Sequence, residues 1–216
     1  MTDWRDWHSK YDDPDSSLSR RLEVVRLGIA SALAHLAGRS EISALSLCAG
    51  EGRVLLPELA ALEGHATYRA VLVERDEVLA RGASDRAASL GLANVHIVVG
   101  DAGCFSTFSS YSPVDLLLLC GIFGNIPRAE IEATVAAAPS MLHPGGFVVW
   151  TRGGPNLHGK NEPDLRPWVR SLFSANGFEE VDFTGDPEPY GVGVARLTKA
   201  PGPRRAVPEQ LFAFTH

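Results

Sequence analysis

Residues 44–53 read ALSLCAGEGR, and this stretch decides the fold. Its first half is an apolar run, which predicts a buried strand, and its second half is a small-residue turn that leads into a helix. Gly50 and Gly52 carry no Cβ, so the backbone can turn sharply there and let a ligand lie against it. Amides at the start of the helix would point at that ligand. The stretch therefore predicts a ligand site between a strand and a helix.

Length and composition favour one domain. The chain has 216 residues, of which 45% are hydrophobic, and this is enough for one well-buried core. We expect an N-terminal lid and helix over 1–40, a core over 41–200 and a tail over 201–216. No stretch approaches the roughly 18 consecutive apolar residues of a membrane helix, and the polar start lacks a signal-peptide pattern. We therefore expect a cytoplasmic protein that does not contact a membrane.

Charge and cysteine usage argue against two further classes of partner. The formal net charge of -6 disfavours nucleic acid, because binding to a phosphate backbone usually needs a basic face. Cys48, Cys104 and Cys120 are widely spaced and form no Cys-x-x-Cys pair. They predict buried free thiols rather than metal ligands or a disulfide, so we expect no metal site.

The chain after the glycine turn alternates between helical spacing and continuous apolar runs. Helices are expected over 53–62, 77–90, 129–141 and 163–176, and strands over 69–74, 95–99, 114–119, 146–151, 178–184 and 191–198. This alternation predicts an α/β fold whose parallel sheet carries helices on both faces. Before it, apolar residues from Leu18 to Leu36 mark an amphipathic helix, and the tail ends in an apolar stretch, 211–214, that should pack back on the body.

Four places between Ile42 and Thr198 resemble the class I S-adenosylmethionine-dependent methyltransferases. Residues 47–53 are similar to the family's glycine-rich turn, whose backbone cradles the methionine part of the cofactor. Glu74 follows at the end of the next strand, about 20 residues beyond the glycines, where an acid can accept the ribose hydroxyls. Asp101 resembles the acid that receives the adenine amino group, and residues 142–147, LHPGGF, resemble the turn before strand five. The resemblance implies a doubly wound, mostly parallel seven-stranded sheet with an antiparallel last strand, and S-adenosylmethionine as cofactor.

Two positions depart from the family pattern. Ser46 stands where the family usually has an acid, and Cys48 stands where it usually has its first glycine. The cofactor contacts should therefore depend more on backbone, including the backbone after strand four. Residues 120–125, CGIFGN, also lack the Asn/Asp-Pro-Pro-aromatic signature of enzymes that methylate nucleobase amino groups. This difference weakens a nucleic-acid substrate further.

The resemblance implies three sets of site residues. The cofactor set is Tyr11, Cys48, Ala49, Gly50, Glu51, Gly52, Glu74, Arg75, Asp101, Ala102, Cys120, Gly121 and Ile122. The substrate set is Trp7, His8, Phe123, Asn125 and Arg152. His158 follows strand five and is the candidate general base, with Arg152 placed to pair with a substrate carboxylate, although an exposed loop histidine without such a role is an alternative.

These residues predict a methyltransferase that acts on a small-molecule acceptor by direct in-line transfer, as a monomer or a homodimer. A general base is needed only when the nucleophile arrives protonated. One alternative is a cofactor-binding or regulatory protein with the same fold and no activity. Another is a nicotinamide-dependent dehydrogenase, for which the third glycine position would fall on Leu55 and the Tyr-x-x-x-Lys pair is missing.

Overall fold

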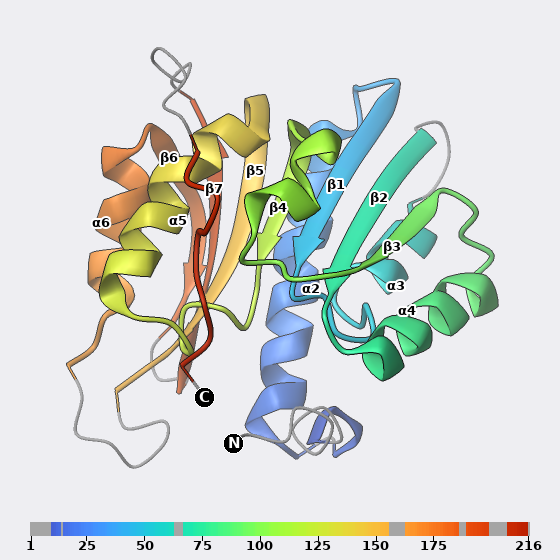
Figure 1. Cartoon of the computed structure of the whole chain (residues 1–216), viewed down its shortest axis with the longest axis horizontal. Coiled ribbons are helices and arrows are strands. Elements are labelled where there is room, and N and C mark those ends of the chain that lie inside the picture. The colour runs from blue at the N-terminus through green and yellow to red at the C-terminus, as the bar shows by residue number, and fades with distance from the viewer. Residues whose placement is uncertain are drawn as a thin grey trace.

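A seven-stranded sheet forms the centre of the molecule (Figure 1). The computed structural model describes residues 10–13, 15–62, 67–155, 163–185, 189–198 and 207–215. The strands are β1 (Glu41–Leu47), β2 (Thr67–Glu74), β3 (Val95–Val99), β4 (Val114–Leu119), β5 (Leu142–Gly153), β6 (Phe178–Thr184) and β7 (Tyr190–Leu197). Their order is β3-β2-β1-β4-β5-β7-β6. The first five strands pair in parallel, and β7 lies antiparallel to both β5 and β6, which confirms the predicted fold class.

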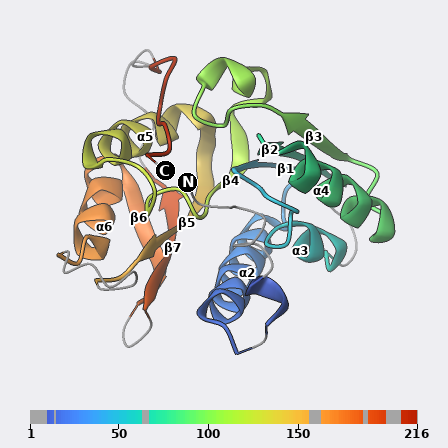
Figure 2. The ribbon, with the colours of Figure 1, turned by 60° about the horizontal axis from the view of Figure 1, so that its bottom comes forward.

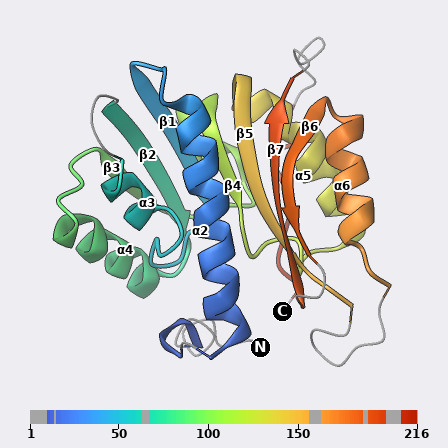
Figure 3. The same ribbon diagram turned by 180° about the vertical axis from the view of Figure 1, so that it is seen from behind.

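Helices cover both faces of this sheet (Figures 2 and 3). One face carries α2 (Ser17–Leu36), α3 (Leu56–Ala60) and α4 (Glu77–Ser89). The other face carries α5 (Arg128–Met141), α6 (Arg166–Ala175) and the short 3-10 helices η2 (Phe105–Thr107) and η3 (Ser109–Tyr111). A further 3-10 helix, η1 (Lys10–Asp12), precedes α2. Among the helices in the described part of the chain, none is long and apolar enough to cross a membrane.

Burial explains why the strands read as continuous apolar runs. Every residue of β4 is buried, and in β1 only Glu41 is exposed. A parallel sheet with helices on both faces hides both sides of its central strands, so alternation of polar and apolar residues is lost. The edge strand β3 is more exposed, and Val99 at its end is 56% exposed.

Helix α2 is a layer of the core rather than part of a lid. It begins after Ser16, whose side chain caps the helix by accepting a hydrogen bond from the Ser19 amide. Its buried side chains pack against the sheet, and a Cβ added at Gly28 would lie 2.9 Å from Val194 of β7. The helix and the strand therefore touch closely at Gly28. Of the N-terminal region expected to act as a lid, only the residues before α2 are still expected to do so.

Helix α3 begins later than the sequence predicts. The expected helix spanned 53–62, but residues 51–55 form turns and the helix proper starts at Leu56. Pro57 lacks an amide donor and is therefore suited to the first turn of a helix. Its position explains the late start and leaves Arg53 in the preceding turn.

The C-terminal segment, residues 207–215, packs on the face that carries α5. It runs beside α5 and the η2–η3 region (Figure 1). Leu211 donates its amide to Gly103, and Phe105 donates its amide to Glu209, at 2.8 and 2.7 Å. Leu211 and Phe212 are buried in the core on this face. The 3-10 helices η2 and η3 are too short to cover this part of the sheet face, and Leu211 and Phe212 of the segment add apolar side chains there.

Candidate functional site

A cavity of about 400 Å³ opens at the carboxyl ends of β1, β2 and β4. Its walls come from η1, α2, the turns after the strands and the C-terminal segment. The lining residues are Tyr11, Arg21, Leu22, Val25, Ser46, Leu47, Cys48, Ala49, Arg53, Val54, Glu74, Arg75, Asp76, Leu79, Asp101, Ala102, Cys120, Gly121, Phe212, Ala213 and Phe214. The chain order of the strands reverses at β1, which lies between β2 and β4. Open α/β sheets bind ligands at such a switch point.

The turn after β1 has a left-handed backbone at alternating positions. Cys48, Gly50 and Gly52 have φ values of 52°, 55° and 70°. A Cβ added at Gly52 would lie 2.5 Å from Leu56 and 2.9 Å from Leu72, so this position requires glycine. Among the described residues, Cys48 is the only one other than glycine with a positive φ. The cysteine at the family's first glycine position therefore keeps the conformation of a glycine, at a cost in backbone strain.

The Glu74 carboxylate lies at the end of β2 and is fixed by two backbone amides. Gly50 donates to one oxygen and Asp76 donates to the other, both at 2.8 Å. A carboxylate has about four acceptor positions, of which these amides use two, and Glu74 lines the cavity. Asp76 in turn caps α4 by accepting the amides of Val78 and Leu79. Glu74 is thus held in one orientation by the turn after β1 and by the start of α4.

Asp101 reaches the same cavity from the loop after β3. Its Oδ1 atom accepts the amide of Gly103 at 2.8 Å, and Ala102 beside it is buried. Since β2 and β3 are neighbours, Glu74 and Asp101 stand at adjacent strand ends. Two acidic acceptors therefore line one wall of the cavity.

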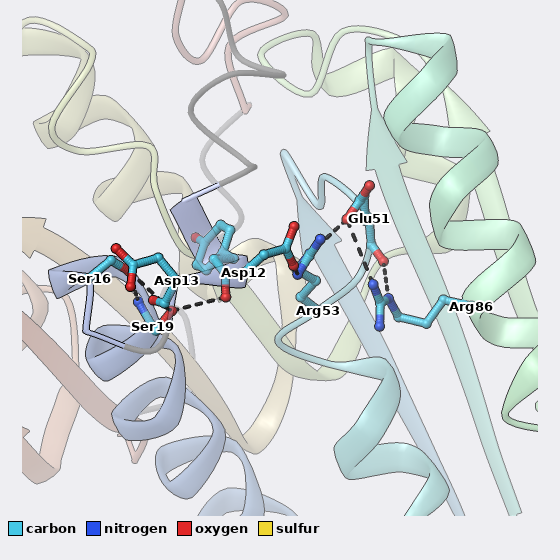
Figure 4. Close-up of polar contacts among 8 residues, drawn as sticks. Asp12, Asp13, Ser16, Ser19, Glu51, Arg53 and Arg86 are labelled. Atoms are coloured by element: carbon cyan, nitrogen blue, oxygen red, sulfur yellow. Dashed lines mark hydrogen bonds and ion pairs between the residues drawn. The ribbon is translucent and has the colours of Figure 1, made fainter.

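A chain of ion pairs connects η1 to the glycine turn (Figure 4). Arg53 pairs with Asp12 at 2.6 Å and with Glu51 at 2.7 Å, and Arg86 of α4 lies 3.7 Å from the same Glu51 oxygen. The hydrogen bond from Arg53 holds the pKa of Asp12 below its usual value. Glu51 therefore acts as a link between two arginines and lies outside the cavity lining.

Further hydrogen bonds hold η1 against α2. The Ser19 hydroxyl donates to the carbonyls of Asp13 and Tyr11, at 2.7 and 3.0 Å. The Ser19 amide donates to the Ser16 hydroxyl, so Asp13, Ser16 and Ser19 lie together in Figure 4. The Tyr11 hydroxyl accepts a hydrogen bond from Arg21 at 2.7 Å. Tyr11 is thereby fixed in the cavity wall.

Two cysteine thiols line the cavity at neighbouring strand ends. Burial raises the pKa of the Cys48 thiol far above its usual range and that of Cys120 to about 12. Both thiols are therefore protonated at neutral pH and contribute small, weakly polar surface rather than charge. All three cysteines are free, as predicted, but they are half-buried rather than buried.

Sequence reasoning missed the contribution of the C-terminal segment and of α2 to the cavity. Phe212, Ala213 and Phe214 line it, and the Ala213 amide donates to Glu130 of α5 at 2.7 Å. The only signal was the apolar end of the chain, which predicts burial but not a location. From α2, Arg21, Leu22 and Val25 also line the cavity, at helical spacing on the sheet-facing side.

Most of the predicted cofactor residues meet in this cavity. Those that line it are Tyr11, Cys48, Ala49, Glu74, Arg75, Asp101, Ala102, Cys120 and Gly121. The others lie behind this surface: Gly50 and Gly52 are buried in the turn, Glu51 faces two arginines, and Ile122 is fully buried. Trp7, His8 and His158 lie outside the described residues.

Of the predicted substrate residues, the three that the structure describes do not line the first cavity. Phe123 is fully buried, with its ring 6.2 Å from Trp150 and 6.3 Å from Phe173, so it belongs to the aromatic core and the expectation of a pocket residue is corrected. Asn125 and Arg152 line a second cavity, of about 330 Å³, beyond the loop between β4 and α5. Asn125 donates its side-chain amide to Gly121 at 2.7 Å, which braces this loop.

Comparison with known proteins identifies the fold through structure rather than sequence. No protein-family model and no curated protein matches the sequence. Among solved structures, magnesium protoporphyrin IX methyltransferase from Synechocystis PCC 6803, with bound SAH, has a TM-score of 0.67 at 11% identity over 90% of this chain and 94% of that one. The chain has the class I S-adenosylmethionine-dependent methyltransferase fold. An O-methyltransferase family protein from Burkholderia thailandensis has a TM-score of 0.66 at 14% identity, over 91% and 61% of the two chains.

A third solved structure with this fold is more distant. Fibrillarin from Aeropyrum pernix, with natively bound S-adenosyl-L-methionine, has a TM-score of 0.55 at 19% identity over 71% and 66% of the two chains. The chain spans only half to two thirds of the length of several such structures. At these identities the likeness concerns the fold.

Proposed function

We propose that this protein binds S-adenosylmethionine and transfers its methyl group to a small-molecule acceptor. The observation that carries the proposal is the convergence of Glu74, Asp101 and the turn after β1 on one cavity at the switch point of the sheet. Two of the solved structures with this fold contain S-adenosyl-L-methionine or SAH. The net charge of -6 favours a small molecule over a nucleic acid.

The residues present suit this cofactor. A volume of about 400 Å³ lies in the range of small-molecule sites. Glu74 has acceptor positions for the ribose hydroxyls, and Asp101 has one for the adenine amino group. The turn that begins at Cys48 offers backbone to the methionine part. Ser46 is buried beside this turn and supplies no carboxylate, so backbone groups would bear more of that contact.

The bound cofactor would supply an electrophilic methyl group on a positively charged sulfur. The chain's own residues would align the reactants and keep water out, because in-line transfer needs orientation more than a covalent intermediate. Tyr11, held by Arg21, forms one wall, and Phe212 and Phe214 form another. His158 remains the proposed general base for a protonated nucleophile.

The sheet topology argues against the dehydrogenase alternative. Dinucleotide-binding folds use the strand order 3-2-1-4-5-6 in a mostly parallel sheet. Here β7 is inserted antiparallel between β5 and β6. A cytoplasmic location and a monomeric or homodimeric state stay predictions from the sequence.

Transfer of a labelled methyl group tests the proposed activity directly. The protein would be incubated with methyl-labelled S-adenosylmethionine and a panel of small hydroxyl, amine, thiol and carboxyl compounds. We expect label in a small-molecule product and formation of SAH. Cofactor binding without transfer to any compound would instead favour a non-catalytic cofactor-binding protein.

A further inference from the structure

Arg53 lies between the glycine turn and η1 and lines the first cavity. Toward η1, its guanidinium pairs with the Asp12 carboxylate at 2.6 Å and lies 5.8 Å from the centre of the Tyr11 ring, which is a cation–π distance. Toward the turn, its Nε atom pairs with the Glu51 carboxylate at 2.7 Å. One side chain therefore joins η1 to the turn after β1.

A second arginine holds this arrangement in place. Arg86 of α4 donates from Nε to the Glu51 carbonyl at 3.1 Å, and its Nη2 atom lies 3.7 Å from the Glu51 oxygen that Arg53 contacts. Helix α4 approaches closely here, because a Cβ added at Gly82 would lie 3.2 Å from the Glu51 side chain. The side chain of Arg53 is 20% exposed, whereas that of Asp12 is 66% exposed. Arg53 is thus the fixed partner of the ion pair, and η1 brings Asp12 to it.

Helix α2 holds η1 through other contacts. The Ser19 hydroxyl donates to the carbonyls of Tyr11 and Asp13, at 3.0 and 2.7 Å. Arg21 donates to the Tyr11 hydroxyl at 2.7 Å. These hydrogen bonds join η1 to α2 and not to the glycine turn, and Figure 4 shows the contacts with α2 on one side of Asp12 and those with the turn on the other. The ion pair of Asp12 therefore gives η1 a second, separate attachment.

We propose that Arg53 is a positioning residue that locks η1 into the wall of the cofactor cavity, so that its ion pair with Asp12 sets the rate at which the cofactor and its product SAH leave. This inference rests on the proposed function, because it assigns the first cavity to the cofactor. Tyr11 of η1 lines that cavity, so loosening of η1 would open the wall that Tyr11 forms. The sequence patterns did not place Arg53 among the site residues.

The rate of SAH release tests the role of the ion pair. Labelled SAH bound to the protein would be displaced by an excess of unlabelled SAH and followed by rapid filtration. Asp12→Asn keeps the size of the side chain and removes its charge, and it should release SAH about twofold to fivefold faster than the wild type, as expected for loss of one exposed ion pair. Arg53→Gln also removes the contacts with Glu51 and Tyr11, so its effect should be at least as large.

A double variant and added salt separate the ion pair from a general effect on the turn. When both residues act through one contact, Asp12→Asn/Arg53→Gln releases SAH no faster than Arg53→Gln alone. Raising the salt concentration from about 0.05 M to about 0.5 M should speed release from the wild type more than from Asp12→Asn, because salt screens an exposed pair. A role of Arg53 confined to the shape of the glycine turn would produce neither result.

The pair formed by Arg170 and Glu180 provides a matched control. Like Arg53, Arg170 pairs with a carboxylate at 2.6 Å and lies over an aromatic ring, that of Phe183, at 4.3 Å. This pair joins α6 to β6, and neither of its residues lines the first cavity. Glu180→Gln should therefore leave SAH release and its salt dependence unchanged. Thermal unfolding checks that each variant is folded, and the exposed position of Asp12 makes Asp12→Asn the decisive variant.

The outcomes separate this inference from the proposed function. Faster release from Asp12→Asn and Arg53→Gln, with no further increase in the double variant and none in Glu180→Gln, supports the inference. Normal release from Asp12→Asn, additive effects in the double variant, or equal salt dependence of the wild type and Asp12→Asn overturns the inference alone. Absence of SAH binding in the wild type contradicts the proposed function itself.

Discussion

The backbone amide of Gly50 donates a hydrogen bond to the carboxylate of Glu74 over 2.8 Å. This bond joins the turn after β1 to the end of β2. The second carboxylate oxygen accepts the Asp76 amide, so the side chain is oriented before any ligand arrives. The predicted acid and the predicted glycine turn therefore form one preorganised unit, in which Gly50 acts through Glu74 rather than as part of the cavity wall.

Replacement of Glu74 tests its role in binding. Glu74→Gln keeps the size of the side chain but removes its charge and replaces one acceptor oxygen by an NH2 donor. We expect the affinity for SAH to fall about tenfold to a hundredfold, as for loss of hydrogen bonds to a charged group. Calorimetric titration measures the change, and Glu132→Gln, at an exposed position of α5, is the control that should bind normally. Equal affinity of both variants for SAH would show that Glu74 does not contribute to cofactor binding.

The left-handed backbone at Cys48 predicts a difference between two substitutions. Cys48→Gly and Cys48→Ala both remove the thiol, but only alanine retains a Cβ at φ 52°. The glycine variant should therefore be the more stable of the two by about 1 kcal/mol. Urea unfolding of both proteins measures this difference. A more stable alanine variant would show that the backbone at this position is relaxed.

Two neighbouring aromatic residues of the C-terminal segment should have separable roles. Phe212 is 2% exposed and belongs to the core, so Phe212→Ala should lower the free energy of unfolding by about 3–5 kcal/mol. Phe214 is half-buried and lines the cavity, so Phe214→Ala should weaken SAH binding several-fold with a smaller loss of stability. Denaturation and calorimetry on both variants give the comparison. An unchanged affinity of Phe214→Ala would place the segment outside the binding surface.

The pair formed by Asp164 and buried Arg166 predicts a pH-dependent contribution to stability. Hydrogen bonding from Arg166 lowers the pKa of Asp164 in the folded protein. The contribution is therefore complete above the unfolded pKa, about 3.9, and is lost as the pH falls through the lower folded value. Asp164→Asn should reduce the free energy of unfolding by about 1–3 kcal/mol at pH 7.

Unfolding experiments on the wild type and Asp164→Asn at several pH values measure this effect. The difference between the two proteins should be constant from pH 7 down to about pH 5 and should shrink below about pH 4. A difference that stays the same at pH 3 would show that ionisation of Asp164 does not stabilise the fold.

Local sequence patterns predicted the strands of the sheet because each strand can be recognised from a few consecutive residues. The run at 114–119 is buried throughout, and both glycines of the first turn have the left-handed backbone that their residue type allows. The helix after the turn was predicted too early because the apolar spacing begins at Val54, whereas Pro57 decides where the first turn forms. Local pattern thus gave the type of each element more securely than its ends.

Site residues could be predicted from the sequence only where they directly follow a strand. Glu74 and Asp101 follow strands directly, so their meeting follows from the parallel sheet. Phe123 also follows a strand, yet it packs with Trp150 and Phe173, since an aromatic ring suits either a pocket or a core. Phe214 and Arg128 reach the two cavities through long-range packing, which no local pattern encodes.

Calorimetric titration of the folded protein with SAH tests the central claim most directly, because it needs no knowledge of the acceptor. We predict saturable binding of one SAH per chain, weakened in Glu74→Gln and retained in Glu132→Gln. Absence of binding by both SAH and S-adenosylmethionine, with protein shown to be folded by cooperative thermal unfolding, would contradict it.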